Sequence, residues 1–364
     1  MEIESLDQLD ALLALGKGLA GARLQGLDLA SREPALLGVD PRGAVVLGGT
    51  LTPRLEQHLR EGGAVLFPVV PGCPVDVYRP HLYPPEELYR GLDQGYPCTP
   101  DALAYRWSRE GSLRHDALTT LLRAMHDDAV TDALDEVVAG RRCVGVMGGH
   151  ALKRGTEGYR EAALLGRALA REDLLVLTGG GPGAMEAANL GARLAQAADD
   201  ALDDALARLA AVPSFAPDVA AWADVALKVR AEHPAPGRPA SIGIPTWFYG
   251  HEPPNAFACL QAKYFSNAVR EDALLSRATH GLVYLPGAAG TVQELFQAVT
   301  PGYYGADGGV PLVLVGRAHW TRTVPVWDAL TTLAGDLPLA QRLMLLEDAA
   351  DPAPVRGALR DLAA

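Results

Sequence analysis

The sequence predicts an α/β protein: a doubly wound parallel sheet with a helical insertion, preceded by a smaller N-terminal α/β domain. Three observations lead to this fold class. From about residue 142, short apolar runs alternate with stretches of helical periodicity, as in successive βα units. Three of those runs end in a turn of glycines and other small residues, at the strand ends where such sheets bind ligands. The length of 364 residues allows two domains.

The first part, residues 1–138, is less regular. The runs AVVLG (44–48) and AVLFP (64–68) predict two short strands on either side of a helix over 53–60. The proline-rich passage PGCPVDVYRPHLYPPEELYRGL favours a surface loop. Apolar residues at helical spacing, closed by a glycine, predict a helix over 116–138. We expect an N-terminal domain over 1–138, to which the sequence assigns no clear role.

The second part, residues 139–364, is expected to be the ligand-binding domain. The sequence predicts five strands, at CVGVMGG, DLLVLTGGG, ASIGIP, HGLVYLPG and VPLVLVG. The stretch NAFACLQAKYFSNAVREDALLSRA predicts one long helix. Residues 196–238 are too long for an αβ connection of about two to six residues, so we expect one or two inserted helices. A solvated insertion is the simpler interpretation, with a lid or an oligomer contact as alternatives.

Composition and charge argue against several classes of protein. A formal net charge of −12 disfavours a broad nucleic-acid surface, which needs clustered Lys and Arg. A small phosphate ligand remains compatible, because helix N-terminal N–H groups can hold one. The cysteines form no C-x-x-C pair, so neither a zinc site nor a disulfide framework is expected. No signal-peptide pattern and no apolar run of about 18 residues occur, so we expect a cytoplasmic protein without a membrane span.

Each of the three turns has a structural and a functional interpretation. The residues concerned are Gly148, Gly149 and His150 in MGGH, Gly180, Gly181 and Gly183 in GGGPG, and Gly287, Ala288, Ala289 and Gly290 in PGAAG. Glycines let a backbone approach a ligand, and a following helix N-terminus favours an anion. A tight turn without a ligand explains any one of them, but three at one sheet edge favour a site. GGGPG is not the dinucleotide fingerprint, because Pro182 interrupts it and no ribose-binding acid follows.

Glu294 stands three positions after Thr291, and this spacing has two explanations. T-x-x-E is the pattern of a capping box, in which the two side chains satisfy each other's backbone donors. Alternatively, the PGAAG turn and Thr291 bind a phosphate, and Glu294 faces the group that carries it. Spacing alone favours the capping box. Arg270, in SNAVREDALLSRA, would ordinarily be a solvated arginine paired with Glu271 or Asp272.

Two further loops lie at the same predicted edge. His150 follows the first strand directly and is more often a hydrogen-bonding loop histidine than a catalyst. The aromatic residues of PTWFYGHEPPN follow the third strand. Trp247, Phe248 or Tyr249 could stack on a planar base there, and core packing is about equally favoured. The histidines show no metal-ligand spacing, so no metal is expected.

These motifs, in this order, resemble the LOG-type phosphoribohydrolases, whose signature is PGGxGTxxE preceded by a helix with an arginine. The resemblance is closer to the larger bacterial pyrimidine/purine nucleotide 5′-monophosphate nucleosidases. GGHAL, TGGGPGAMEA, EPPN, the arginine of VRED and PGAAGTVQE match in order, over residues 142–300. The resemblance implies a modified Rossmann fold, a homodimer or higher homo-oligomer, and no cofactor. Lys263 has no recognisable pyridoxal-phosphate cup around it.

The resemblance implies hydrolysis of the N-glycosidic bond of a nucleoside 5′-monophosphate such as AMP or GMP, giving free base and ribose 5-phosphate. Glu294 and Arg270 would be the catalytic pair, so the active-site interpretation of Glu294 is preferred to the capping box. The implied substrate- or phosphate-binding residues are Gly148, Gly149, His150, Gly180, Gly181, Gly183, Glu252, Asn255, Gly287, Ala288, Ala289, Gly290 and Thr291. The expected partner is the nucleotide, with no nucleic acid and no membrane.

Three features depart from the family pattern. Ala288 replaces the second glycine of the signature, and its Cβ would cost about 1–2 kcal/mol if the position requires a positive φ. Gln293 stands where many plant-type members have an acid, and the insertion is absent from the short members. Because of Ala288, the alternative function is a non-catalytic nucleotide- or molybdenum-cofactor-binding carrier of the same fold.

Overall fold

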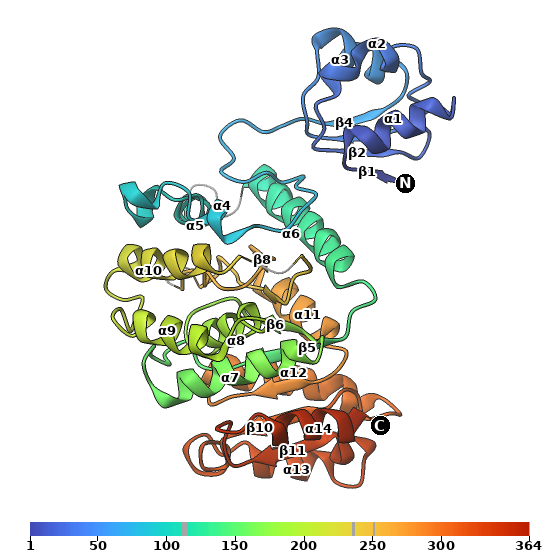
Figure 1. The fold of residues 1–364 in the computed structure, drawn as a ribbon. Helices are drawn as coiled ribbons and strands as arrows, with labels where there is room; N and C mark the ends of the chain where they lie inside the picture. The colour runs from blue at the N-terminus through green and yellow to red at the C-terminus, as the bar shows by residue number, and fades with distance from the viewer. Residues whose placement is uncertain (111–115, 235–236, 250–251, 364) are drawn as a thin grey trace. The chain divides into compact units, whose positions relative to one another are not determined.

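The computed structural model describes residues 1–110, 116–234, 237–249 and 252–363. The chain forms two compact units, each with its own parallel sheet (Figure 1). Unit 1 comprises Met1–His81 and Glu110–Ala133, and unit 2 comprises Leu82–Arg109 and Leu134–Ala364. Within the described ranges, no helix is both long enough and apolar enough to cross a membrane.

Unit 1 is the smaller α/β unit, with four short strands in the order β1-β2-β3-β4. Its elements are β1 (Glu2–Ile3), α1 (Leu6–Ala14), β2 (Arg23–Gln25), α2 (Glu33–Leu36), β3 (Val45–Leu47), α3 (Pro53–Glu61), β4 (Val65–Phe67) and the start of α6 (Ala117–Val138). Leucines of its strands and of α1 to α3 form one buried core. The predicted strands at 44–48 and 64–68 and the predicted helices at 53–60 and 116–138 are confirmed. β1 and β2 were not predicted, because their residues, EI and RLQ, include charged and polar side chains and form no apolar run.

Unit 2 contains a seven-stranded parallel sheet in the order β11-β10-β9-β5-β6-β7-β8. Its strands are β5 (Cys143–Met147), β6 (Leu175–Thr178), β7 (Ser241–Gly243), β8 (Leu260–Gln261), β9 (Leu282–Tyr284), β10 (Leu312–Val315) and β11 (Leu343–Leu346). Its main helices are α4 (Pro85–Leu88), α5 (Pro100–Arg109), α7 (Glu157–Arg171), α8 (Ala184–Arg193), α9 (Asp199–Leu209), α10 (Val219–Glu232), α11 (Asn267–Arg277), α12 (Ala289–Tyr304), α13 (Trp327–Ala334) and α14 (Ala353–Ala363).

The sheet is doubly wound, as the sequence predicts. From β5 the chain runs through β6 and β7 to one edge, and then returns to β9 on the other side of β5. Val144 and Val146 of β5 share a core with residues of α7, α8 and α14. Gly145 faces the opposite side, where a Cβ would lie 3.3 Å from the Ala278 Cβ at the end of α11. Since side chains alternate along a strand, helices cover both faces. The five predicted strands are β5, β6, β7, β9 and β10.

α7 and α8 approach each other closely because glycines lie at their contact. A side chain at Gly191 of α8 would overlap the Ala163 carbonyl oxygen of α7. One at Gly166 of α7 would likewise overlap the Ala188 carbonyl oxygen of α8. Neither glycine has a positive φ, so both are needed for space and not for backbone conformation.

The insertion predicted over 196–238 forms α9 and α10, and one face of it is buried and not solvated. Leucines of α9 and apolar residues of α10 belong to the same core as the sheet. Arg154 fixes the insertion to α8: its Nε donates to Glu186 at 3.0 Å, and its Nη1 donates to the Trp222 carbonyl at 3.1 Å. The Arg154 guanidinium also lies 4.5 Å from the centre of the Trp222 ring.

The prediction of one long helix over 255–278 is wrong for the first half of that range. Only Asn267–Arg277 is helical, and β8 lies within the segment. Asn255 Oδ1 accepts hydrogen bonds from the N–H groups of Phe257 and Ala258, both at 3.0 Å, which turns the chain before β8. Ser266 then caps α11 by accepting from the Val269 N–H. Apolar residues at helical spacing therefore concealed a buried turn and a strand.

The expected domain boundary at 138 differs from the two units, because residues 82–109 belong to unit 2. Asp101 of α5 explains this assignment. It is 1% exposed and lies 2.5 Å from the ammonium group of Lys263, which is also 1% exposed. Trp247 Nε1 donates to the same carboxylate at 2.8 Å, and Tyr96 donates to it at 2.7 Å. A buried ion pair with added hydrogen bonds thus fixes this N-terminal segment to the larger unit.

The glycine contact between α7 and α8 yields a stability prediction. We expect Gly191→Ala to lower the free energy of unfolding by about 2 kcal/mol or more, because the added methyl group meets backbone of α7. Gly357→Ala is the matched control, since a Cβ there, in α14, would have no atom within 4 Å. Removing that helix glycine should raise stability by about 0.5–1 kcal/mol. Urea unfolding compares both variants with wild type, and equal stabilities would contradict the packing argument.

The buried ion pair yields a second prediction. Asp101→Asn leaves the Lys263 ammonium buried without a counter-charge and should lower the free energy of unfolding by about 3–5 kcal/mol. Adding Lys263→Gln removes that charge and should recover most of the loss. Thermal and urea unfolding of the two single variants and the double variant measure the coupling. Strictly additive losses would show that the two side chains do not depend on each other.

Candidate active site at the carboxyl edge of unit 2

The three predicted turns meet at the carboxyl ends of β5, β6 and β9. The Gly149 N–H donates to the Pro286 carbonyl at 3.0 Å, and the Gly149 carbonyl accepts from the Ala184 N–H at 3.2 Å. MGGH therefore lies between the other two turns. Two of the turns follow β5 and β9, the neighbouring strands from which the chain leaves in opposite directions. Ligands of open α/β sheets bind at such a switch point.

Several of the predicted phosphate-binding glycines are in contact with protein and do not line open space. A Cβ at Gly180 would lie 2.6 Å from Pro245, and one at Gly148 would lie 2.7 Å from Ala184. A Cβ at Gly183 would overlap the Gly149 carbonyl oxygen, and one at Gly287 would overlap the Thr291 side chain. Gly180 and Gly183 also have positive φ, which side chains rarely adopt. These glycines hold the turns together.

Two glycines have surroundings that leave space for a ligand. A Cβ at Gly290, in the first turn of α12, would meet no atom within 4 Å. At Gly181 the nearest atoms belong to two side chains, with Glu252 Oε2 3.5 Å from the position of a Cβ. His150 Nδ1 lies 3.1 Å from Glu252 Oε1, so these two predicted site residues are brought together beside the GGGPG turn.

Asn255 is fully buried and holds the GGGPG turn from beneath. Its N–H donates to the Gly180 carbonyl at 2.8 Å, and its Nδ2 donates to the Gly181 carbonyl at 3.1 Å. Its Oδ1 is occupied by two backbone donors. Asn255 was expected to bind substrate, but these contacts make it a positioning residue for the turn.

α12 begins at Ala289, and its start differs from the capping box. Ala288 is the N-cap, with no side-chain hydrogen bond, and Thr291 lies inside the first turn. The prediction of a capping box is wrong, because a capping box would need Thr291 as the N-cap and the helix already begins at Ala289. Ala288 has φ −113°, an extended conformation open to any residue, so the strain that its Cβ would cause at a positive φ does not arise.

Arg270 of α11 and Glu294 of α12 form an ion pair at this edge. Arg270 Nη1 lies 2.7 Å from Glu294 Oε1, and its Nη2 donates to Asn267 Oδ1 at 2.9 Å. Arg270 is only 8% exposed, so it is not the solvated helix arginine that its sequence context suggests. A Cβ at Gly179 would lie 3.8 Å from Nη1, which places the guanidinium against the GGGPG turn.

Glu294 lies in an acidic and largely buried environment. Burial raises its pKa above the ordinary 4.5, whereas the charge and hydrogen bond of Arg270 lower it, and the charges of Glu271 and Glu252 raise it again. Glu271 is 5% exposed and accepts hydrogen bonds from Asn267 Nδ2 at 2.6 Å and Gln293 Nε2 at 2.7 Å. Gln293 thus serves as a donor to Glu271, a contact that an acid there would replace with repulsion.

The predicted aromatic residues divide between core and surface. Trp247 is 2% exposed and stacks on Phe265, with ring centres 4.5 Å apart, so it is not available to a base. Phe248 and Tyr249 are exposed and pack edge to face. The Tyr249 hydroxyl accepts from Asn267 Nδ2 at 3.2 Å, which connects this aromatic pair to the helix turn that carries Arg270.

Sequence reasoning missed two contributors to this edge. Asn267 was missed because the long-helix prediction concealed the start of α11; the pattern S-N-x-x-R-E, with Ser266 as N-cap, would have revealed it. His319 belongs to the short π-helical segment His319–Thr323 after β10. Its Nε2 lies 2.9 Å from the Gly287 carbonyl oxygen, and as a donor it supports the PGAAG turn. No sequence signal connects two residues so far apart.

Comparison with known proteins finds one family model and several solved structures that are similar to parts of the chain. Residues 141–198 match the model of the SLOG cluster4 family. The molybdenum cofactor binding protein from Rippkaea orientalis is 14% identical, with a TM-score of 0.38, covering 61% of this chain and 99% of its own. The Moco carrier protein from Chlamydomonas reinhardtii is 19% identical, with a TM-score of 0.37, covering 60% and 98%. No curated protein matches the chain. The matched segment 141–198 runs from β5 through α8 and contains two of the three turns, MGGH and GGGPG.

Proposed function

We propose that unit 2 hydrolyses the N-glycosidic bond of nucleoside 5′-monophosphates, releasing free base and ribose 5-phosphate. The observation that carries the proposal is the pairing of Arg270 with Glu294 at the switch point, against the GGGPG turn. Glu294 is a largely buried carboxylate with a raised pKa, and perturbed carboxylates in such positions are typical of catalytic groups.

The reaction assigns a role to each of these two side chains. As the bond between C1′ and the base breaks, its electron pair leaves with the base, and positive charge develops on the ribose ring. The Glu294 carboxylate stabilises that charge and orients a water molecule, whose oxygen bonds to C1′. One proton of this water goes to the departing base, so atoms and charge balance. Arg270 holds the carboxylate in place and contacts the ribose or the base.

The start of α12 is the proposed phosphate site. The first bond within the helix joins the Val292 N–H to the Ala288 carbonyl at 3.0 Å, so the N–H groups of Ala289, Gly290 and Thr291 have no partner within the helix. Gly290 has open space beside it, and the helix dipole favours a dianion there. Glu294 lies one turn further along the same helix. A 5′-phosphate held at the helix start would therefore anchor the ribose within reach of Glu294.

The second candidate function is a non-catalytic carrier of a nucleotide or of the molybdenum cofactor. The observation that favours it is the glycine-rich edge itself, because phosphate-binding turns suit any phosphorylated ligand. In a carrier, the pair between Arg270 and Glu294 would only fix α11 against α12. The two functions differ in whether Glu294 is needed for turnover or only for structure.

The decisive variant is Glu294→Gln, which keeps the shape and removes the charge. We expect ribose 5-phosphate release from AMP, GMP, IMP, CMP and UMP to fall at least about a hundredfold. AMP binding, measured by calorimetry, should change only a few-fold. Glu157→Gln, an exposed glutamate in the first turn of α7, is the charge-matched control and should keep full activity. Nucleotide binding without release by the wild type would support the carrier and refute the enzyme.

The raised pKa of Glu294 predicts the pH dependence of the reaction. Only the ionised carboxylate can stabilise the positive ribose, so kcat/KM should fall as pH falls through the pKa of Glu294, above the ordinary 4.5. Arg270 lowers that pKa, so Arg270→Met should raise it. The acid limb of the residual activity should then move to higher pH. An acid limb that stays in place would mean that another group controls it.

A further inference from the structure

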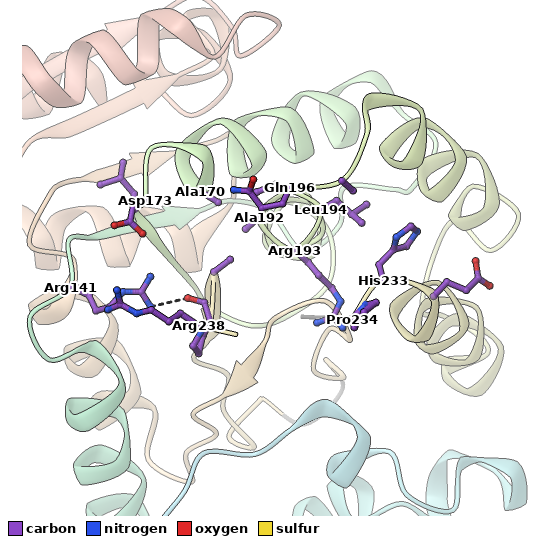
Figure 2. A pocket seen from close by; sticks show the side chains of 16 residues that line it. Arg141, Ala170, Asp173, Ala192, Arg193, Leu194, Gln196, His233, Pro234 and Arg238 are labelled. Carbon is purple, nitrogen blue, oxygen red and sulfur yellow. Dashed lines mark hydrogen bonds between the residues drawn. The ribbon is translucent and has the colours of Figure 1, made fainter. Parts of the chain in front are cut away.

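A cavity of about 390 Å³ lies at the opposite edge of the unit 2 sheet (Figure 2). Arg141, Leu174 and Ala240 line it, and each stands just before a strand, β5, β6 or β7. The other walls come from the ends of α7 and α8 and from the chain after α10. Since all strands are parallel, this is the amino edge, away from the glycine turns. The size is typical of small-molecule sites.

Arg193, near the end of α8, is the central charged residue of this cavity. Its side chain is among those that line the cavity in Figure 2, beside Pro234. Arg193 is 8% exposed, and its Nε and Nη1 have no hydrogen-bond partner among the described residues. Its Nη2 makes one long contact of 3.3 Å with the Arg230 carbonyl. Burial lowers the pKa of Arg193 to about 10, and the like charge of Arg230 adds to this effect.

Two more arginines carry positive charge into the same cavity. Burial lowers the pKa of Arg141, and the like charge of nearby Arg238 lowers it further. Arg141 Nη1 donates to the Pro239 carbonyl at 2.8 Å, and that bond is drawn in Figure 2. Arg238 is exposed and has no ion pair within the part of the chain that the structure describes.

The acidic residues of the lining neutralise these arginines only in part. Glu232 is turned to Arg208, with Oε1 2.9 Å from Nη2. The negative charge of Asp173 raises the pKa of Arg141 and so offsets part of the effect of burial and of Arg238. The charge of Glu86 and a hydrogen bond with the Cys259 thiol favour the charged form of Arg193, but Glu86 is paired with Arg230 and a thiol is a weak acceptor. The cavity therefore keeps an excess of positive charge.

A purely structural explanation is that these arginines cap the carboxyl ends of helices, where cations are favoured. Arg171 does this, donating from Nε to the Ala195 carbonyl at 2.9 Å. Arg193 differs, because its Nε and Nη1 are buried with no oxygen or nitrogen acceptor among the residues that the structure describes. A buried guanidinium with unmet donors is destabilising unless something compensates it.

We propose that the amino-edge cavity, defined by Arg141, Arg193 and Arg238, binds a small organic anion with a phosphate or carboxylate group. The charge of the anion offsets the positive charge of these three arginines, including the like charges of Arg141 and Arg238. Alanines, Leu174 and Pro234 form the remaining wall, so the ligand has an apolar body beside its charged group. This site is independent of the proposed hydrolysis, because it uses no residue of the carboxyl edge.

The test measures binding of pyrophosphate and of citrate to the full chain, by thermal shift and by calorimetry. We expect saturable binding of at least one probe to wild type, and at least about tenfold weaker binding to both Arg193→Met and Arg238→Ala. Arg42→Ala, an exposed arginine of unit 1, is the charge-matched control and should bind as wild type does. Because Arg193 and Arg238 lie at the amino edge, loss of binding in both variants separates this site from a phosphate bound at α12.

A stability readout separates binding from helix capping. Without any probe, Arg193→Met should unfold at the wild-type temperature or above it, because it removes an uncompensated buried charge. Arg193→Met that unfolds at a lower temperature, yet binds the probes as tightly as wild type, would overturn the proposal in favour of capping. Absence of saturable binding of either probe to wild type at millimolar concentration would overturn it as well.

Discussion

The candidate active site depends on the close approach of three backbone turns at the centre of the unit 2 sheet. Gly149 donates to one neighbouring turn and accepts from the other, and the glycines around it leave no room for side chains. This contact sets the start of α12 and the position of the GGGPG turn. Arg270 and Glu294 can then meet between α11 and α12 only because both helices leave the sheet at this edge.

Much of the fold was predictable because the strands of unit 2 are buried, apolar and separated by helices of clear periodicity. Strand type and order of elements follow from that alternation. The failures are local. The segment 255–266 has apolar residues at helical spacing, but Asn255 turns the chain before β8: its Oδ1 accepts from two nearby backbone N–H groups, and its N–H and Nδ2 bind the GGGPG turn. Short strands that include charged residues, such as β1, form no apolar run that could be recognised.

The site was predictable in its residues but not in their individual tasks. Glycine turns at strand ends, with Arg270 and Glu294 nearby, could be read from motifs. The structure divides those residues differently: Asn255 and most of the glycines hold backbone in place, whereas Gly181 and Gly290 border space. T-x-x-E spacing suggested a cap, but the helix start depends on the preceding turn. His319 acts on Gly287 from a distant segment, which local sequence cannot show.

The ion pair between Asp101 and Lys263 has a consequence for how this chain can be divided. The backbone runs from unit 1 into unit 2 at residue 82, returns to unit 1 at 110, and leaves it again within α6. No single cut separates the two units. A fragment that begins at residue 139 would expose the surface that α5 covers and would leave the Lys263 ammonium group without its counter-charge. Residues 82–109 are therefore part of the fold of unit 2, and a shortened version of unit 2 needs to retain them.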